Sequence, residues 1–138
     1  MARVLVTEKI AQNGLDLLAE AGHDVDVQEG LTEEQLIATI PGASALIIRS
    51  ATQVTEAVLA AASDLIVVGR AGIGLDNVDV PAATARGVMV VNAPQSNIVS
   101  AAEQTMALML AIARNVPQAH SALMGYWLMT TRMEFDLG

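Results

Sequence analysis

The 138-residue sequence contains no cysteine, two histidines and three aromatic residues, one each of Phe, Trp and Tyr. Without cysteine, neither a disulfide framework nor a thiolate metal site is possible. His23 and His120 are far apart and have no ligand spacing, so we predict no metal site. A chain of this length suits one domain of ordinary size, buries about two-thirds of its unfolded surface and needs no such staples.

Basic residues are also scarce, with seven Lys and Arg against 15 Asp and Glu and a net charge of −8. They are spread along the chain and form no basic stripe, which argues against nucleic acid as a partner. The negative charge is more typical of a need for solubility.

Long hydrophobic runs are missing. The longest apolar run, residues 106–113, has eight residues, which is too short to span a bilayer. Residues 1–6 lack the charged region and long apolar segment of a signal peptide. We therefore expect a cytoplasmic protein with no membrane partner.

Short apolar runs alternate with helical patterns over the first hundred residues. Strands are predicted at residues 4–6, 25–27, 45–48, 65–68 and 88–91, and helices between them. Thr32 and Gln35 form a capping-box pattern, and Asp79 with Pro81 is typical of a helix start. The run 45–48 is apolar throughout, so we expect burial on both faces. The rhythm predicts an α/β fold: a flavodoxin-like, doubly wound parallel sheet of five strands in the order 2-1-3-4-5.

The last third of the chain differs from this rhythm. Residues 92–97 are predicted as a loop, and Ser100 with Glu103 as a second capping box that starts a helix apolar almost all round. Such a helix is normally buried by more than one neighbour, and Pro117 should end or kink it near Val116. We predict a flavodoxin-like domain over residues 1–98 and a hinge, long apolar helix and tail over residues 99–138.

The most informative segment is residues 69–79, Gly-Arg-Ala-Gly-Ile-Gly-Leu-Asp-Asn-Val-Asp, directly after the fourth predicted strand. Glycine permits positive φ and a close approach to a ligand. Consecutive free N–H groups suit a carboxylate or phosphate, and Arg70 adds a charge-assisted contact. We predict a small-anion site. The spacing is Gly-x-x-Gly-x-Gly, and the dinucleotide fingerprint Gly-x-Gly-x-x-Gly is absent.

Polar residues follow the other predicted strands as well. Thr7 follows the first, Arg49 and Ser50 the third, and Asn92 the fifth, before Ser96 and Asn97. Ligands of doubly wound sheets bind outside the carboxyl ends of the strands, so these groups should converge on one edge. Together they suit a small acid that carries several oxygens.

Simpler interpretations stay open. In one, the glycines serve only as turn residues, and in another, Arg49 or Arg70 only pairs with Asp76 or Asp79. Ser96 and Asn97 are also common turn residues before a helix.

Several linked motifs occur in order: residues 49–52, 69–79, 83–88, 91–94, 96–97 and 100–103. From residue 2 to about 123 they resemble the D-isomer-specific 2-hydroxyacid dehydrogenase family, most closely the amino-terminal part of its D-3-phosphoglycerate dehydrogenase branch. The resemblance implies a substrate-binding domain whose loop N–H groups hold a carboxylate. The residues that it implies face a small anionic 2-hydroxy acid are Arg49, Ser50, Arg70, Gly72, Ile73, Gly74 and Asn97.

The resemblance also implies an NAD-dependent oxidation of 3-phosphoglycerate in serine biosynthesis. The family's Gly-x-Gly-x-x-Gly loop and catalytic Arg, Glu and His belong to a second domain that these 138 residues lack. We therefore assign this chain no catalytic residue and no cofactor, and expect weak acid binding without turnover.

The remaining implications concern assembly and origin. Residues 96–100 match the family's hinge, and the helix that follows helps to form its dimer, so a homodimer through residues 99–138 is expected. The surroundings of Trp127 are more apolar than in the family, which indicates a truncated or engineered chain. The alternatives are a non-binding scaffold whose apolar helix drives dimerisation and a regulatory anion-binding module.

Overall fold

The computed structural model describes the backbone of residues 1–95 and 97–135 and the side chains of residues 1–95 and 97–126. The chain divides into two compact units, Met1–Ser96 and Asn97–Gly138, and each is described by itself. The predictions for Ser96 and for the surroundings of the Trp127 side chain fall outside the described residues.

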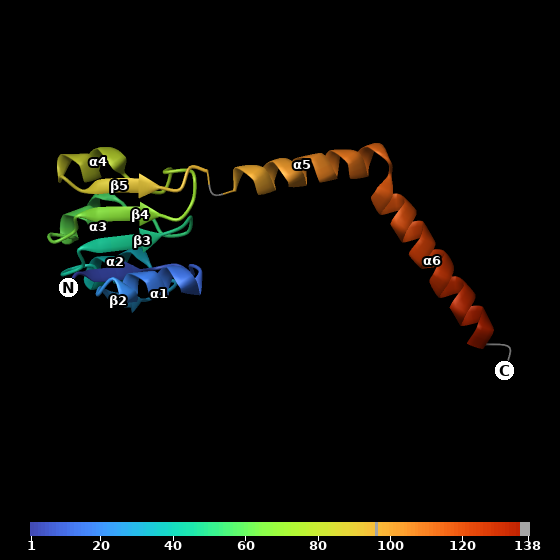
Figure 1. Cartoon of the computed structure of the whole chain (residues 1–138), viewed down its shortest axis with the longest axis horizontal. Coiled ribbons are helices and arrows are strands. Elements are labelled where there is room, and N and C mark those ends of the chain that lie inside the picture. Colours follow the sequence, from blue (N-terminus) through green and yellow to red (C-terminus); the bar gives the residue numbers. More distant parts are fainter. Residues whose placement is uncertain (96, 136–138) are drawn as a thin grey trace. The chain divides into compact units, whose positions relative to one another are not determined.

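The first unit contains one parallel sheet of five strands in the order β2-β1-β3-β4-β5, as Figure 1 shows. The strands are β1 (Arg3–Val6), β2 (Asp24–Val27), β3 (Ala45–Ile48), β4 (Val67–Arg70) and β5 (Met89–Asn92). This order confirms the predicted flavodoxin-like fold. Strand β4 begins two residues later than predicted and ends at Arg70, because its register with β3 continues until Ile48 lies opposite Arg70.

Four helices connect these strands: α1 (Gln12–Glu20), α2 (Glu33–Thr39), α3 (Glu56–Ala61) and α4 (Val80–Ala85). The capping box of α2 is present, since Thr32 accepts from the Gln35 N–H and the Gln35 side chain accepts from the Thr32 N–H. Asp79 caps α4 by accepting from the Ala82 N–H at 2.9 Å. These predicted helix starts are confirmed.

The main core lies on one face of the sheet. Leu5, Leu46 and Val68 occupy neighbouring register positions on β1, β3 and β4, and all three are fully buried. They belong to one cluster with buried residues of the three helices on that face, among them Leu36, Val58, Leu59 and Ala83. Each Å² of apolar surface removed from water stabilises the fold by about 25 cal/mol. This cluster is therefore the main stabilising element of the unit.

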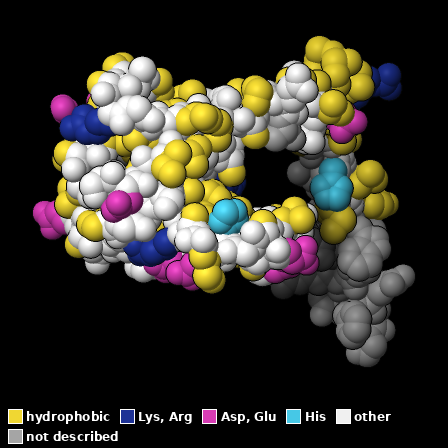
Figure 2. All heavy atoms as spheres, turned by 60° about the vertical axis from the view of Figure 1, so that its left-hand side comes forward, with side chains coloured by type: hydrophobic (Ala, Val, Ile, Leu, Met, Phe, Trp, Pro, Cys, Tyr) yellow, Lys and Arg dark blue, Asp and Glu magenta, His cyan; other side chains and the backbone are white. Residues whose placement is uncertain are grey.

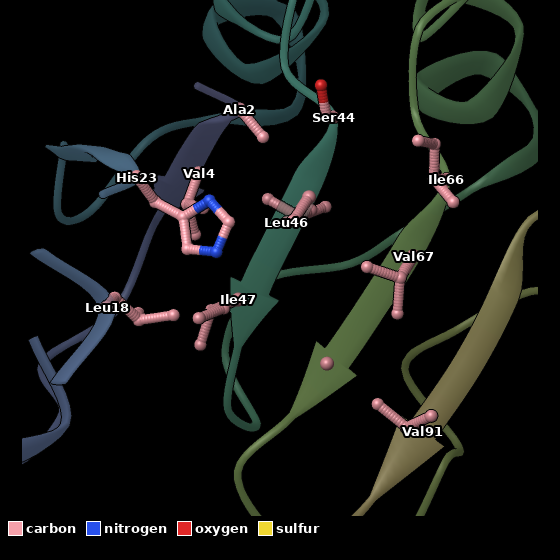
Figure 3. Close-up of a pocket in the computed structure, with 12 residues that line it drawn as sticks. Ala2, Val4, Leu18, His23, Ser44, Leu46, Ile47, Ile66, Val67 and Val91 are labelled. Atoms are coloured by element: carbon pink, nitrogen blue, oxygen red, sulfur yellow. The ribbon is translucent and has the colours of Figure 1, made fainter. Parts of the chain in front are cut away.

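The opposite face is more open, and the prediction that residues 45–48 are buried on both faces is wrong. Ala45 and Ile47 are only half buried. The β1–β2 connection crosses the sheet in the opposite direction from the other three, so α1 is the one helix of the first unit that lies on this face. The resulting hollow has a volume of about 390 Å³. Leu18 of α1 lines it together with Ile47, Val67 and Val91, as Figure 3 shows.

The second unit consists of α5 (Ile98–Ala113) and α6 (Val116–Phe135). Helix α5 begins at Ile98, and the Ala101 N–H already bonds to the Asn97 carbonyl, so Ser100 lies inside the helix and the predicted second capping box is wrong. The predicted break at Pro117 is confirmed. Asn115 adopts a φ of 52° between the helices, and Pro117 lies in the first turn of α6, where its missing N–H costs nothing.

Helix α5 exposes its apolar side chains, and Figure 2 shows hydrophobic atoms along it. Seven large apolar residues of this helix are more than half exposed: Ile98, Val99, Met106, Leu108, Met109, Leu110 and Ile112. The expected burial by more than one neighbour is therefore not found in the part of the chain that the structure describes. Among the described residues, no helix combines the length and apolarity that a membrane span needs.

Candidate functional site

The polar groups that the sequence singled out lie at the carboxyl ends of the strands. Thr7 follows β1, Arg49 follows β3, and Arg70 and Asn92 are the last residues of β4 and β5. Ile48, Arg70 and Asn92 occupy the same register position across three parallel strands. These residues therefore share one edge of the sheet, where ligands of this architecture bind.

Arg70 is the central cation of this edge, and its side chain is only 11% exposed. Its Nε donates to the Asn77 Oδ1 at 3.0 Å and to the Arg49 carbonyl at 3.1 Å. Its one ion-pair contact among the described residues is with Asp76, which is 86% exposed and lies 4.0 Å from Nη2. Because this contact is long and Asp76 is exposed, it neutralises little of the charge on the Arg70 guanidinium.

The glycines after Arg70 have a different role from the predicted one. In the described chain the glycines with positive φ are Gly22, Gly30, Gly42 and Gly87, so neither Gly72 nor Gly74 is needed for a left-handed turn. A Cβ on Gly72 would lie 2.7 Å from the Nη1 of Arg70, and one on Gly74 would lie 2.6 Å from the Oδ1 of Asp76. Glycine here allows the loop to lie close against charged side chains.

The predicted row of free N–H groups is shorter than expected. The Ala71 N–H bonds to the Ile48 carbonyl at 2.8 Å, and the Gly72 N–H bonds to the Arg70 carbonyl at 2.9 Å. Within the described residues, the N–H groups of Ile73 and Gly74 have no hydrogen-bond partner. The N–H groups of Leu75, Asp76 and Asn77 likewise have no hydrogen-bond partner within the described residues. The prediction that Ile73 and Gly74 face an anion is compatible with this geometry and stays a prediction.

Two backbone carbonyls of the glycine loop accept hydrogen bonds from the end of β5 and the residue after it. The Asn92 side chain donates to the Ile73 carbonyl at 2.6 Å, and the Ala93 N–H donates to the Gly72 carbonyl at 2.9 Å. Asn92 thus orders the loop, which the sequence did not show.

Glu8 was missed by sequence reasoning, although its place one residue beyond Thr7 at a strand end was a usable signal. Its carboxylate accepts hydrogen bonds from the backbone N–H groups of Arg49 at 2.8 Å, Thr52 at 2.9 Å and Ala51 at 3.1 Å. Burial raises the pKa of Glu8, but these donors outweigh it and hold the pKa below its ordinary value. The chain therefore supplies its own anion to the turn after β3.

Arg49 and Ser50 lie in this turn and are exposed. The Arg49 Nη1 donates to the Lys9 carbonyl at 3.4 Å. Both side chains border the edge that carries Arg70, but the turn's N–H groups are occupied by Glu8. The exposed side chains of Arg49 and Ser50 are accessible to a ligand, and their role in binding an acid stays a prediction.

Asn97 belongs to the second unit, where it is the N-cap residue of α5 and makes no side-chain cap. Its role toward an acid stays a prediction. The described residues contain no cluster of three or more His, Asp or Glu side chains that suits a metal ion. The face shown in Figure 2 carries scattered acidic groups and only isolated Lys and Arg.

The hollow on the open face has different chemistry. Figure 3 shows His23 and Ser44 among mainly aliphatic side chains. The His23 Nδ1 is buried and has no hydrogen-bond partner among the described residues. The lining contains no Lys or Arg that could pair with a carboxylate, so the edge that holds Arg70 stays the predicted acid site.

Comparison with known proteins places these features in context. A family model described as the D-isomer specific 2-hydroxyacid dehydrogenase catalytic domain matches residues 4–132. D-3-phosphoglycerate dehydrogenase of Synechocystis sp. is 47% identical over 123 residues, and that of Mycobacterium tuberculosis is 52% identical over 122 residues. These matches cover 89% and 87% of this chain but 22% of each relative, so the chain spans less than a quarter of their length.

Solved structures agree with these matches. The TT0316 protein of Thermus thermophilus has a TM-score of 0.79 and 35% identity, over 86% of this chain and 39% of that one. The NAD+-bound 3-phosphoglycerate dehydrogenase of Entamoeba histolytica has a TM-score of 0.71 and 28% identity, over 80% of this chain and 38% of that one.

Proposed function

The chain belongs to the D-isomer-specific 2-hydroxyacid dehydrogenase family, and on this basis we propose that its first unit is the acid-binding domain of an NAD-dependent, D-3-phosphoglycerate-type dehydrogenase. One observation carries the proposal: a guanidinium that is 11% exposed lies against a glycine loop, and its one ion-pair contact among the described residues is a 4.0 Å contact with Asp76, which is 86% exposed. A buried cation of this kind is stabilised by a bound anion.

In this proposal each residue has a stated role. Arg70 binds the carboxylate of a small 2-hydroxy acid, and the N–H groups of Ile73 and Gly74 donate to it. The exposed side chains of Arg49 and Ser50 contact the acid's more distant oxygens. Asn97 remains a candidate contact, and no residue of the chain is assigned a proton-transfer role.

The residues present do not fit the pyrophosphate of NAD. The loop that follows Arg70 leads into α4, whose N-terminal N–H at Ala82 is already bonded to the Asp79 carboxylate. A dinucleotide loop leaves such groups free for phosphate. We therefore propose that these 138 residues bind the acid weakly and do not transfer hydride by themselves. Serine biosynthesis in the cytoplasm is the setting that we propose for the whole enzyme.

A titration followed by NMR tests this function. D-3-phosphoglycerate is added to the 15N-labelled chain, and the amide signals of Ile73 and Gly74 are followed. We expect saturable shifts in the millimolar range, which Arg70→Ala abolishes. Arg86→Ala is the matched control, because it removes an equal charge from a residue that pairs with Glu56 at 3.7 Å.

Two results count against the proposal. One is the absence of any shift at Ile73 and Gly74 with tens of millimolar acid. The other is an equal loss of affinity for the acid in Arg70→Ala and Arg86→Ala, which would indicate nonspecific attraction between the acid and the chain's positive charges. NAD reduction by the purified chain would contradict the assignment of binding without turnover.

A second candidate function is assembly, since α5 carries seven large apolar side chains that are more than half exposed. Monomeric proteins seldom expose large contiguous apolar patches, and this favours a homodimer formed through residues 99–138. In sedimentation, we expect the wild type to dimerise and Leu110→Glu to shift it to monomer. Gln104→Glu on the same helix is the control, and a wild type that is monomeric at all concentrations contradicts the idea.

A further inference from the structure

Asn77 is a buried polar side chain, 3% exposed, in the loop between Arg70 and α4. Its Nδ2 donates to the carbonyls of Arg49 at 2.8 Å and Thr52 at 2.7 Å. Its Oδ1 accepts from the Arg70 Nε at 3.0 Å. Three hydrogen bonds nearly exhaust what one amide side chain can make. A single side chain therefore joins the turn after β3 to the last residue of β4.

These hydrogen bonds determine the orientation of the Arg70 guanidinium group. Its Nε is bonded both to the Asn77 Oδ1 and to the Arg49 carbonyl, and the Asn77 Nδ2 bonds to that same carbonyl. The resulting triangle fixes one edge of the planar group. The opposite part then faces the glycine loop, where Nη1 is 2.7 Å from the position of a Cβ on Gly72.

Orientation matters because a guanidinium recognises a carboxylate by two parallel N–H donors in one plane. An arginine free to rotate loses conformational entropy when it binds, whereas one already fixed does not. Asn77 makes no contact with the free N–H groups of Ile73 and Gly74 in the described structure, so its effect on a ligand passes through Arg70.

We propose that Asn77 is the positioning residue of the acid-binding site: it fixes the Arg70 guanidinium against the glycine loop and thereby sets the affinity for a carboxylate. The proposal takes its ligand from the function proposed above, but its geometry stands separately. A purely structural Asn77 would affect stability alone.

The first measurement uses no ligand. The Arg70 Nε–H signal is assigned by NMR, and its exchange with water is compared in wild type and Asn77→Ala, with Asn13→Ala on the exposed surface of α1 as control. We expect slow exchange in the wild type and in the control, and exchange at least about tenfold faster in Asn77→Ala, because a charge-assisted hydrogen bond is lost. Equal exchange in all three proteins overturns the proposal.

The second measurement is acid binding. D-3-phosphoglycerate affinity at Ile73 and Gly74 should fall about tenfold or more in Asn77→Ala, as expected for a site that loses its preorganisation. Asn77→Asp keeps an oxygen that accepts from the Arg70 Nε but adds a negative charge. It should restore slow Nε–H exchange without restoring affinity. Wild-type affinity in folded Asn77→Ala overturns the proposal.

Two further outcomes separate the hypotheses. If the wild type binds no acid, the proposed function fails, while the exchange comparison still decides whether Asn77 positions Arg70. If Asn77→Ala does not fold, the scalar coupling across the hydrogen bond from the Arg70 Nε to the Asn77 side-chain carbonyl is measured in the wild type. Its presence supports the positioning role, and its absence overturns it.

Discussion

The Glu8 carboxylate accepts three backbone N–H groups of the turn after β3, a position that many proteins reserve for a bound anion. The chain therefore contains one turn that holds an anion and a second turn that we propose as an anion site. One is satisfied internally by Glu8, and the other, at Ile73 and Gly74, has no internal anion among the described residues. This difference supports the proposal that an acid binds beside Arg70.

Glu8 should make stability depend on pH. Its pKa is lowered in the folded chain, so its contribution is complete above the ordinary glutamate pKa of about 4.3 and is lost as the pH falls through the lower folded value. Glu8→Gln should destabilise the wild type by about 1–2 kcal/mol at pH 7, and the difference should shrink on acidification below pH ~4. Thermal unfolding between pH 3 and 7 measures this, and a constant difference contradicts it.

Gly72 is required for the close approach of the loop to Arg70. Gly72→Ala places a Cβ 2.7 Å from Nη1, so the end of a flexible side chain must move. We expect acid affinity to fall about tenfold, with a stability change below about 1 kcal/mol because the backbone need not shift. Gly14→Ala in α1 is the control, since its Cβ meets only the Ile10 side chain at 3.8 Å. Unchanged affinity in Gly72→Ala would place the acid elsewhere.

At the scale of elements, helix starts were predicted correctly where a side chain caps the helix by accepting a hydrogen bond from a backbone N–H of its first turn. Thr32 and Asp79 both cap as expected, because capping depends on three or four consecutive residues. Ser100 has the same local pattern but lies inside α5, since nothing in the pattern prevents the helix from starting earlier. Strand β4 was misplaced for the opposite reason: its end depends on pairing with β3.

The capping box of α2 gives a direct test at this scale. Thr32→Ala removes the oxygen that accepts from the Gln35 N–H and should cost about 1 kcal/mol of unfolding free energy. Thr32→Ser keeps that oxygen and should cost much less. Urea unfolding of the three proteins measures the difference, and an equal loss for both variants would show that the lost methyl group, rather than the cap, matters.

At the scale of the whole molecule, the two units differ in what stabilises them. The sheet unit has a buried cluster around Leu46, whereas α5 exposes its apolar residues and has no buried residue of its own. An isolated helix of this length is marginal in water. The units should therefore open with very different free energies.

Hydrogen exchange tests this difference. Amides of β3 should exchange only by global opening of the sheet unit, while those of α5 in dilute protein should exchange at nearly unprotected rates. Leu46→Ala should cost about 2–5 kcal/mol and accelerate exchange in β1, β3 and β4 alike without altering α5. Strong protection of α5 in dilute protein would show that its apolar surface is covered by a partner copy.

The sequence by itself determined the strand–helix rhythm, the sheet order and the place of the glycine loop at a strand end, because periodicity, caps and glycine spacing act over short distances along the chain. Only the tertiary structure decided that Glu8 occupies the turn after β3, that Asn77 joins this turn to Arg70, and that Gly72 serves close approach rather than a positive φ. These contacts link residues from different strand ends, and a parallel sheet brings them together only once its register is complete.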